Sequence, residues 1–220
     1  MGNKKFIAII AGLVTLGAWA SIYLSVCGFP PRLDARPHEA LGNVVAEEAL
    51  KLRAPGGRIM LVCRDTARFK NPASVAQLRG FHAVLKAAGA AVASTNSIKI
   101  DPLRLMAVPG LDYLQILKAV SDTDVIVSFL GPPVLNPDQT ARLTEKRPKI
   151  VAVCSGAMPS QVNLKRIFDE KLLHVAVISR PDASTNAPPS DAPRSWFDHL
   201  YTLVTPANLS ELPAPVSTRQ

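Results

Sequence analysis

The stretch Arg58-Ile59-Met60-Leu61-Val62-Cys63 is a short apolar run that follows the turn Gly56-Gly57. Such a run is typical of a strand that is covered on both faces, as the strands of a parallel sheet are. Asn71-Pro72 then opens a helix, because asparagine caps free backbone amides and proline suits the first helical position. The apolar stripe of this helix consists of Val75, Leu78, Phe81, Leu85 and Ala88. The sequence therefore predicts a strand followed by a covering helix.

The alternation of strand and helix continues along the chain. Before the first strand, residues 41–52 have the spacing of an amphipathic helix. Further strands are predicted at 91–94, 125–130, 149–154 and 174–179, and further helices at 111–120, 136–148 and 160–172. Alternating elements imply right-handed crossovers and a parallel sheet. The predicted fold class is α/β, a three-layer sandwich whose five-stranded, mostly parallel sheet has the flavodoxin-like order 2-1-3-4-5.

The N-terminal segment from Phe6 to Phe29 contains no charged residue. A spanning helix needs about 20 apolar residues, whereas a cleaved signal peptide has an apolar core of roughly 7 to 15. We therefore expect an N-terminal membrane anchor at 1–29 with a transmembrane helix at about 6–28. Lys4 and Lys5 favour a cytoplasmic N-terminus and place the rest of the chain on the periplasmic side. Alternatively, Cys27 resembles the lipidated cysteine of a bacterial lipoprotein.

Proline-rich segments divide the remaining chain. Three prolines in residues 30–37 resist helix formation and suit a stiff spacer. Residues 181–195 combine four prolines with small polar residues, a composition that predicts a loop. The predicted order is a spacer at 30–37, an α/β domain at 38–180, a loop at 181–195, a return segment at 196–212 with a strand-like run at 201–205, and a disordered tail at 213–220.

Composition excludes several classes of function. The chain has 25 Lys and Arg against 17 Asp and Glu, a net charge of +8. These charges are dispersed and lack interleaved aromatic residues, so we expect no nucleic-acid partner. Three cysteines are too few for a disulfide-built scaffold. Because the sequence has neither metal-ligand spacing nor a phosphate-loop or dinucleotide motif, we expect no metal and no cofactor.

Six short motifs occur in order along the chain: 58–62, Asn71-Pro72, 77–81, 87–89, 121–127 and 149–153. Together they resemble one lobe of the type 1 periplasmic binding proteins and of related repressor ligand-binding domains, over about residues 58–180. Members of that family bind a small molecule in a cleft between two similar lobes. The resemblance implies the lobe's α/β fold and ligand binding at its cleft side. The sequence ends about where a second lobe would begin.

Ligands of open parallel sheets bind beyond the carboxyl ends of the strands. That rule selects the loops after the first, third, fourth and fifth strands. Backbone amides at helix starts and guanidinium groups favour a negatively charged ligand group there. The alternative is that these are ordinary strand-to-helix loops. The candidate ligand-binding residues are Arg64, Asp65, Gly131, Cys154, Ser155, Gly156, Arg180 and Asp182.

Three functions remain open. The first is a membrane-anchored, non-enzymatic domain that binds a small ligand, or a transport or signalling partner protein, at the carboxyl rim of the sheet. The second is a structural protein that forms homo-oligomers, in which another chain supplies the missing lobe. The third is a thiol enzyme with Cys154 as nucleophile, although such a cysteine is more often a small buried side chain. We expect a protein that is not an enzyme.

Overall fold

The computed structural model describes residues 2–26, 33–66, 71–99, 108–143, 147–183, 188 and 190–211. It divides into two units, Met1–Asp34 and Ala35–Gln220. The first unit holds helix α1 (Gly2–Val26). The sequence predicts a transmembrane helix at 6–28, but within the described ranges no helix has the length and apolar character needed to cross a membrane. Cys27 and the tail at 213–220 lie outside the described residues.

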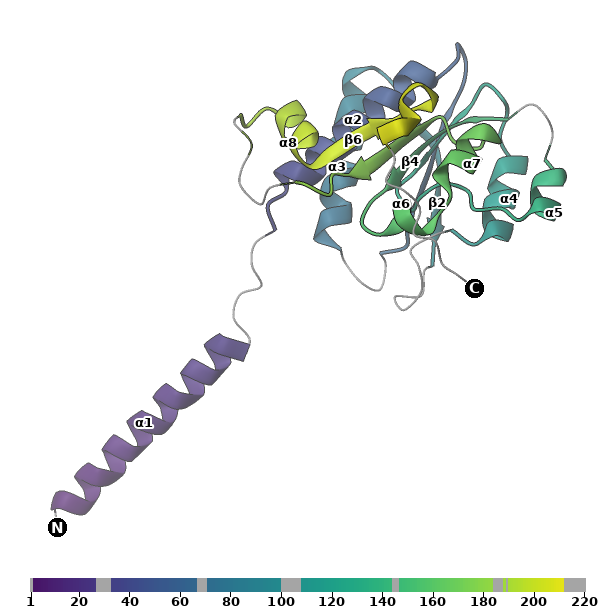
Figure 1. Ribbon diagram of the computed structural model, residues 1–220. Helices are drawn as coiled ribbons and strands as arrows, with labels where there is room; N and C mark the ends of the chain where they lie inside the picture. The colour runs from purple at the N-terminus through teal and green to yellow at the C-terminus, as the bar shows by residue number, and fades with distance from the viewer. Residues whose placement is uncertain are drawn as a thin grey trace. The chain divides into compact units, whose positions relative to one another are not determined.

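The second unit is built on a sheet whose six described strands have the order β2-β1-β3-β4-β5-β6 (Figure 1). The strands are β1 (Ile59–Arg64), β2 (Val92–Ile98), β3 (Val125–Ser128), β4 (Lys149–Cys154), β5 (Val175–Ser179) and β6 (Tyr201–Val204). The first five pair in parallel, and β6 pairs antiparallel with β5. The α/β class and the order 2-1-3-4-5 are confirmed, and the strand-like run of the return segment adds a sixth strand.

The helices differ in length from those predicted. They are α2 (Arg36–Leu52), α3 (Pro72–Ala87), α4 (Gly110–Lys118), α5 (Pro137–Ala141), α6 (Met158–Gln161), α7 (Leu164–Asp169), α8 (Pro193–Leu200) and the 3-10 helix η1 (Pro206–Glu211). Helix α5 has only five residues of the predicted 136–148. The helix predicted at 160–172 is two helices, because the Asn163 side chain accepts a hydrogen bond from the Arg166 amide and starts α7 there.

Two prolines that were expected to prevent helices instead begin them. Helix α2 starts inside the predicted spacer and has Pro37 in its first turn, and α8 starts inside the predicted loop with Pro193 in its first turn. Proline is tolerated there because the first amides of a helix have no partner within the helix. The prediction of irregular chain at these positions was wrong for that reason.

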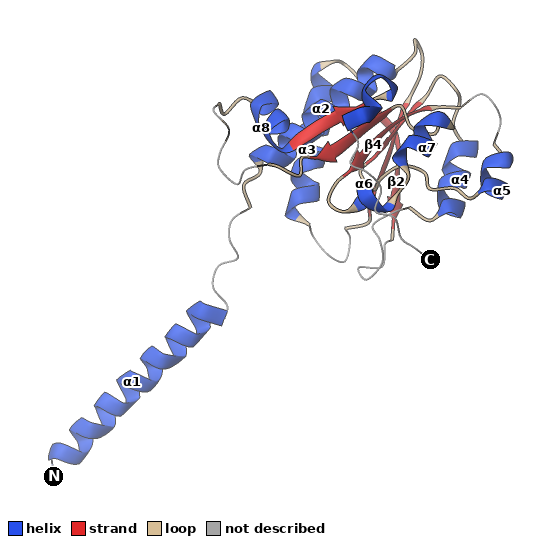
Figure 2. Ribbon diagram, viewed as in Figure 1, coloured by secondary structure: helices blue, strands red, loops and turns tan. Residues whose placement is uncertain are grey.

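Helices cover both faces of the sheet (Figure 2). Successive residues of a strand point to opposite faces, so each strand contributes to two apolar clusters. Ile59, Leu61 and Cys63 of β1 belong to the cluster with α2, α3 and α8. Met60 and Val62 belong to the other cluster, with α4, α6 and α7. The central strands are buried on both sides, as their uninterrupted apolar runs predict.

Helices α2 and α3 pack so closely that glycine is required at their crossing. A Cβ atom on Gly42 would lie 2.0 Å from the backbone oxygen of Gln77, and one on Gly80 would lie 2.3 Å from that of Glu39. Both neighbours are backbone atoms, which cannot move aside without shifting a helix. This crossing fixes the position of α3 and therefore of the loop that precedes it.

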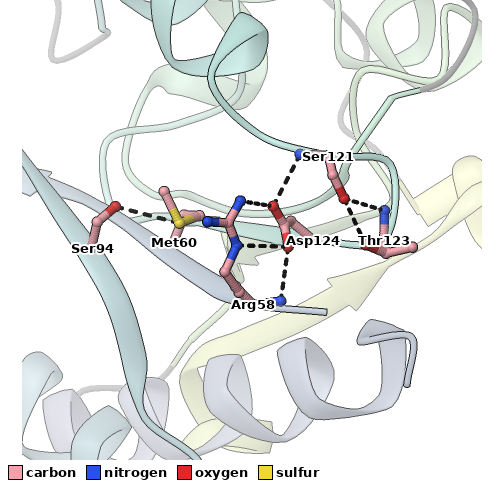
Figure 3. A network of polar contacts seen from close by, with 6 residues as sticks. All are labelled: Arg58, Met60, Ser94, Ser121, Thr123 and Asp124. Atoms are coloured by element: carbon pink, nitrogen blue, oxygen red, sulfur yellow. Dashed lines mark hydrogen bonds and ion pairs between the residues drawn. The ribbon is translucent and has the colours of Figure 1, made fainter. Parts of the chain in front are cut away.

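A polar network joins β1 to the turn before β3 (Figure 3). Asp124 accepts hydrogen bonds from the backbone amide, Nε and Nη2 of Arg58, at 2.8, 3.3 and 2.8 Å, and from the Ser121 amide at 3.0 Å. These bonds, led by that from the Arg58 side chain, lower the pKa of Asp124 from 3.8 to about 2. The network lies at the amino end of the sheet, opposite the predicted site, and has a structural role.

Candidate functional site

The carboxyl ends of β1, β3 and β4 form a pocket with the first turns of α3, and we name it the α3 pocket. It has a volume of about 120 Å³. Its lining combines polar side chains with one aromatic ring. The lining residues are Cys63, Arg64, Asn71, Ala73, Ser74, Gln77, Leu78, Phe129, Leu130, Val153 and Ser155.

Local sequence explains how α3 reaches this rim. The Asn71 side-chain oxygen accepts hydrogen bonds from the amides of Ala73 at 3.0 Å and Ser74 at 3.3 Å, and Pro72 occupies the first turn. The cap fixes the residue at which the helix begins. Ser74 and Gln77, three positions apart, then share the helix side that borders the pocket. The predicted start of this helix at Asn71-Pro72 is confirmed.

Phe129 supplies the aromatic surface of the α3 pocket. It follows β3 directly and is half-buried. Its ring meets that of Phe81 edge to face, with centroids 5.7 Å apart and planes at 90°. Phe81 is fully buried in the cluster under α3, so it holds the Phe129 ring in place. One ring is thus fixed at the pocket wall before any ligand arrives.

Cys63 lines the same pocket with its thiol largely buried. Burial raises the pKa of this thiol, so it stays protonated at neutral pH. Its sulfur lies 4.0 Å from the hydroxyl oxygen of Ser97 on β2. Cys63 therefore contributes an apolar, weakly hydrogen-bonding wall and no thiolate.

A second pocket lies at the same rim where β4 and β5 end, and we name it the α6 pocket. Its volume is about 310 Å³. It is lined by Gly156, Pro159, Ser160, Ile178, Ser179, Arg180 and Pro181. Ile178 belongs to the cluster under α4, α6 and α7, whereas Val153 of the α3 pocket belongs to the opposite cluster. The two pockets are therefore on opposite faces of the sheet.

The structure separates the residues that the sequence grouped into one site. Arg64 and Ser155 line the α3 pocket, whereas Gly156 and Arg180 line the α6 pocket. Asp65, Gly131 and Asp182 follow the predicted strands but line neither pocket. Gly131 has a φ of +87°, and a Cβ there would lie 2.4 Å from the sulfur of Met158. It shapes the turn after β3 and is covered by that methionine.

Cys154 is not accessible to a ligand. Its exposed fraction is 0%, and it belongs to the cluster under α4, α6 and α7. The alternation of side chains along β4 turns it into the core, while Ser155, one position later, is exposed. Burial raises the pKa of its thiol well above the usual range. Of the two interpretations of Cys154, a nucleophile or a small buried side chain, the structure supports the second.

Among the α3-pocket lining residues that sequence reasoning missed are three polar side chains and one aromatic ring. They are Asn71, Ser74, Gln77 and Phe129. The rule used to select candidates considers only loops after strands, whereas three of these come from the following helix and its cap. The sequence does contain a pattern that could have identified three of them. Polar residues at positions 71, 74 and 77 recur at helical spacing beside the apolar stripe. Within the described residues, no group of three or more His, Cys, Asp or Glu is arranged to hold a metal ion.

Comparison with solved structures identifies the architecture. The arabinose-binding protein AraP from Geobacillus stearothermophilus is similar with a TM-score of 0.50 and 15% identity, over 80% of this chain and 63% of that one. The chain has a periplasmic-binding-protein-like fold. No protein-family model and no curated protein matches the sequence. The resemblance expected from the sequence motifs is thus confirmed for the fold of a single lobe.

Two further structures are similar at lower scores. A carbohydrate transporter solute-binding protein from Agrobacterium radiobacter, in complex with D-arabinose, has a TM-score of 0.46 and 13% identity over 81% of this chain and 61% of that one. A LacI transcriptional regulator from Bacteroides fragilis has a TM-score of 0.47 and 10% identity over 79% and 61%. This chain therefore spans less than two thirds of the length of these structures.

Proposed function

We propose that the domain is a non-enzymatic binding module that holds a small neutral polyol, such as a monosaccharide, in the α3 pocket. The observation that carries this proposal is one fixed aromatic ring, Phe129, beside the polar side chains of Ser74, Gln77 and Ser155 at the carboxyl rim. Sugars present hydroxyl groups around an apolar ring face. Polar side chains pair with the hydroxyls, and an aromatic ring covers the face.

The size of the pocket determines how such a ligand is held. Enclosed ligand sites have volumes of about 300 to 1,000 Å³, whereas the α3 pocket has about 120 Å³. One side of a bound monosaccharide therefore stays open to solvent. We expect weak binding by this domain alone, with a Kd in the millimolar range, about −4 kcal/mol.

Titration of the isotope-labelled full chain with D-arabinose and with D-xylose, followed by backbone NMR, tests this proposal. The expected result is saturable shifts at the amides of Ser74, Gln77 and Ser155. Gln77→Ala should weaken binding at least fivefold. Gln115→Ala, on the exposed surface of α4, is the matched control and should bind like the wild type. Shifts that are absent for both sugars, or unchanged in Gln77→Ala, contradict the proposal.

An assembly role is the second candidate, and the edge strand β2 favours it. The seven residues Val92–Ile98 contain no charged side chain, and most are exposed. Natural sheets protect such edges with charges, prolines or bulges, because an open edge can pair with another chain. The pairing of β2 with β1 has one register shift, between Val92 and Ser94, and is regular from Ser94 to Ile98. Light scattering after size exclusion decides this candidate. A dimer that Ser94→Lys dissociates supports pairing through β2, and a monomer at all concentrations contradicts it.

The position of the chain at a membrane is part of the same proposal. Helix α1 exposes large apolar side chains along its described length: Ile10, Leu13, Val14, Leu16, Trp19, Ile22 and Tyr23. Such a helix needs an apolar partner, which a lipid bilayer or a protein surface provides. We propose the bilayer, with the binding domain on the periplasmic side. Lipidation at Cys27 is the alternative means of attachment.

A further inference from the structure

We infer that the α6 pocket is a second binding site, for a small monocarboxylate with a short apolar chain. It is distinct from the polyol site proposed above, because the two pockets open on opposite faces of the sheet. The inference rests on the combination of one cation, held in place, with apolar walls in a pocket of sufficient volume.

Arg180 provides the cation. Its backbone amide donates to the Leu200 oxygen at 2.9 Å, and its side-chain Nε donates to the Tyr201 oxygen at 3.2 Å. These two bonds attach Arg180 to the start of β6 and orient the guanidinium group. Among the described residues no carboxylate forms an ion pair with Arg180. The terminal nitrogens are therefore available for the two oxygens of a carboxylate.

The walls of the pocket are apolar. Pro159, Ile178 and Pro181 line it, and their side chains offer only carbon atoms. The volume of about 310 Å³ is at the lower end of the range for small-molecule sites, about 300 to 1,000 Å³. A branched chain of a few carbons fits this volume, whereas a dianion would leave a second charge against proline and isoleucine.

Small polar groups also line this pocket. The Gly156 amide donates to the Ser179 hydroxyl over 3.4 Å, a long bond that a better acceptor can replace. Gly156 has a φ of +64°, which glycine adopts without strain. Two lining residues, Arg180 and Gly156, thus carry donors that a carboxylate in the pocket can use.

Calorimetry of the full chain with 4-methylpentanoate and with its neutral amide tests the inference. The acid should bind, and the amide should bind at least tenfold more weakly because it lacks the charge. Arg180→Gln should weaken acid binding at least tenfold. Arg142→Gln, at the exposed C-cap of α5, removes an arginine that does not line the pocket and should bind like the wild type. Equal binding of acid and amide, or no binding of the acid at 10-fold excess over a millimolar Kd, overturns the inference.

A second variant tests the same pocket in case Arg180→Gln does not fold. Ser160→Phe places a ring in the pocket and leaves Arg180 unchanged, so it should abolish binding of the acid while circular dichroism stays unchanged. Retained binding in this variant would also overturn the inference. Gln77→Ala should bind the acid normally, so failure of the polyol proposal is distinguishable from failure of this one.

Discussion

Asp124 shows how one buried carboxylate can make stability depend on pH. It is 2% exposed and accepts its hydrogen bonds from Arg58 and Ser121. Because its pKa is about 2 in the folded state against 3.8 ordinarily, its contribution is present above pH 3.8 and is lost as pH falls to about 2. The shift corresponds to about 2 kcal/mol.

We predict that Asp124→Asn lowers the free energy of unfolding by about 2 kcal/mol at pH 7, because Arg58 loses its charged partner. Urea unfolding at pH 7 and pH 3 measures the effect, and the variant should lose less stability than the wild type between these values. Asp122→Asn, an exposed neighbour in the same turn, is the control. An unchanged midpoint in Asp124→Asn would contradict the network's structural role.

His174 makes stability depend on a different range of pH. It precedes β5, and its ring nitrogen accepts a hydrogen bond from the Ile150 amide at 3.2 Å. Burial, with a smaller effect from the Lys149 charge, lowers its pKa from 6.5 to about 4. As the pH falls, His174 is therefore protonated near pH 6.5 in the unfolded chain but only near pH 4 in the folded chain. Stability falls as pH falls through this window.

We predict that the unfolding free energy of the wild type falls by about 1–2 kcal/mol between pH 7.5 and pH 5. In His174→Gln most of this decrease should be absent. The measurement is the urea midpoint at both pH values. His82→Gln, on the exposed side of α3, should keep the wild-type dependence. If His174→Gln shows the same pH dependence as the wild type, the histidine is not its source.

At the scale of elements, the crossing of α2 and α3 leaves no room for a larger side chain at Gly42 or Gly80. We predict that Gly42→Ala and Gly80→Ala each lower the unfolding free energy by more than about 2 kcal/mol, since each methyl group meets backbone atoms. Thermal unfolding measures this. Gly12→Ala in α1 is the control, because a Cβ there meets nothing within 4 Å. Wild-type stability in both domain variants would show that the helices can separate freely.

The predictability of each element depended on how deeply it is buried. β4 coincides with the predicted run at 149–154, because both of its faces need apolar residues. β2 continues to Ile98, four residues beyond the predicted end, since an exposed edge strand needs few apolar side chains. The strand order predicted that a binding site would lie at the carboxyl rim of the sheet. It did not predict two separate pockets there, because their separation depends on the face to which each side chain points.

For the whole molecule, we predict that the full chain sediments with membranes and resists carbonate extraction, whereas a variant that lacks residues 2–26 is released. The physical reason is the set of apolar side chains exposed on α1. Mass spectrometry of the membrane-derived chain distinguishes the modes of attachment. Loss of the residues before Cys27 with added lipid mass indicates a lipoprotein, and an unattached full-length chain contradicts both.

Helix α2 precedes every described strand in the chain, yet it packs against α8, which follows β5. Its inward side, Leu41, Val44 and Val45, shares a cluster with Trp196 and Phe197. At a synthesis rate of about 5–20 residues per second, the apolar side chains of α2 remain for many seconds without their neighbours from α8. During synthesis the apolar side of α2 therefore stays exposed until α8 has been made, and this cluster closes only after that.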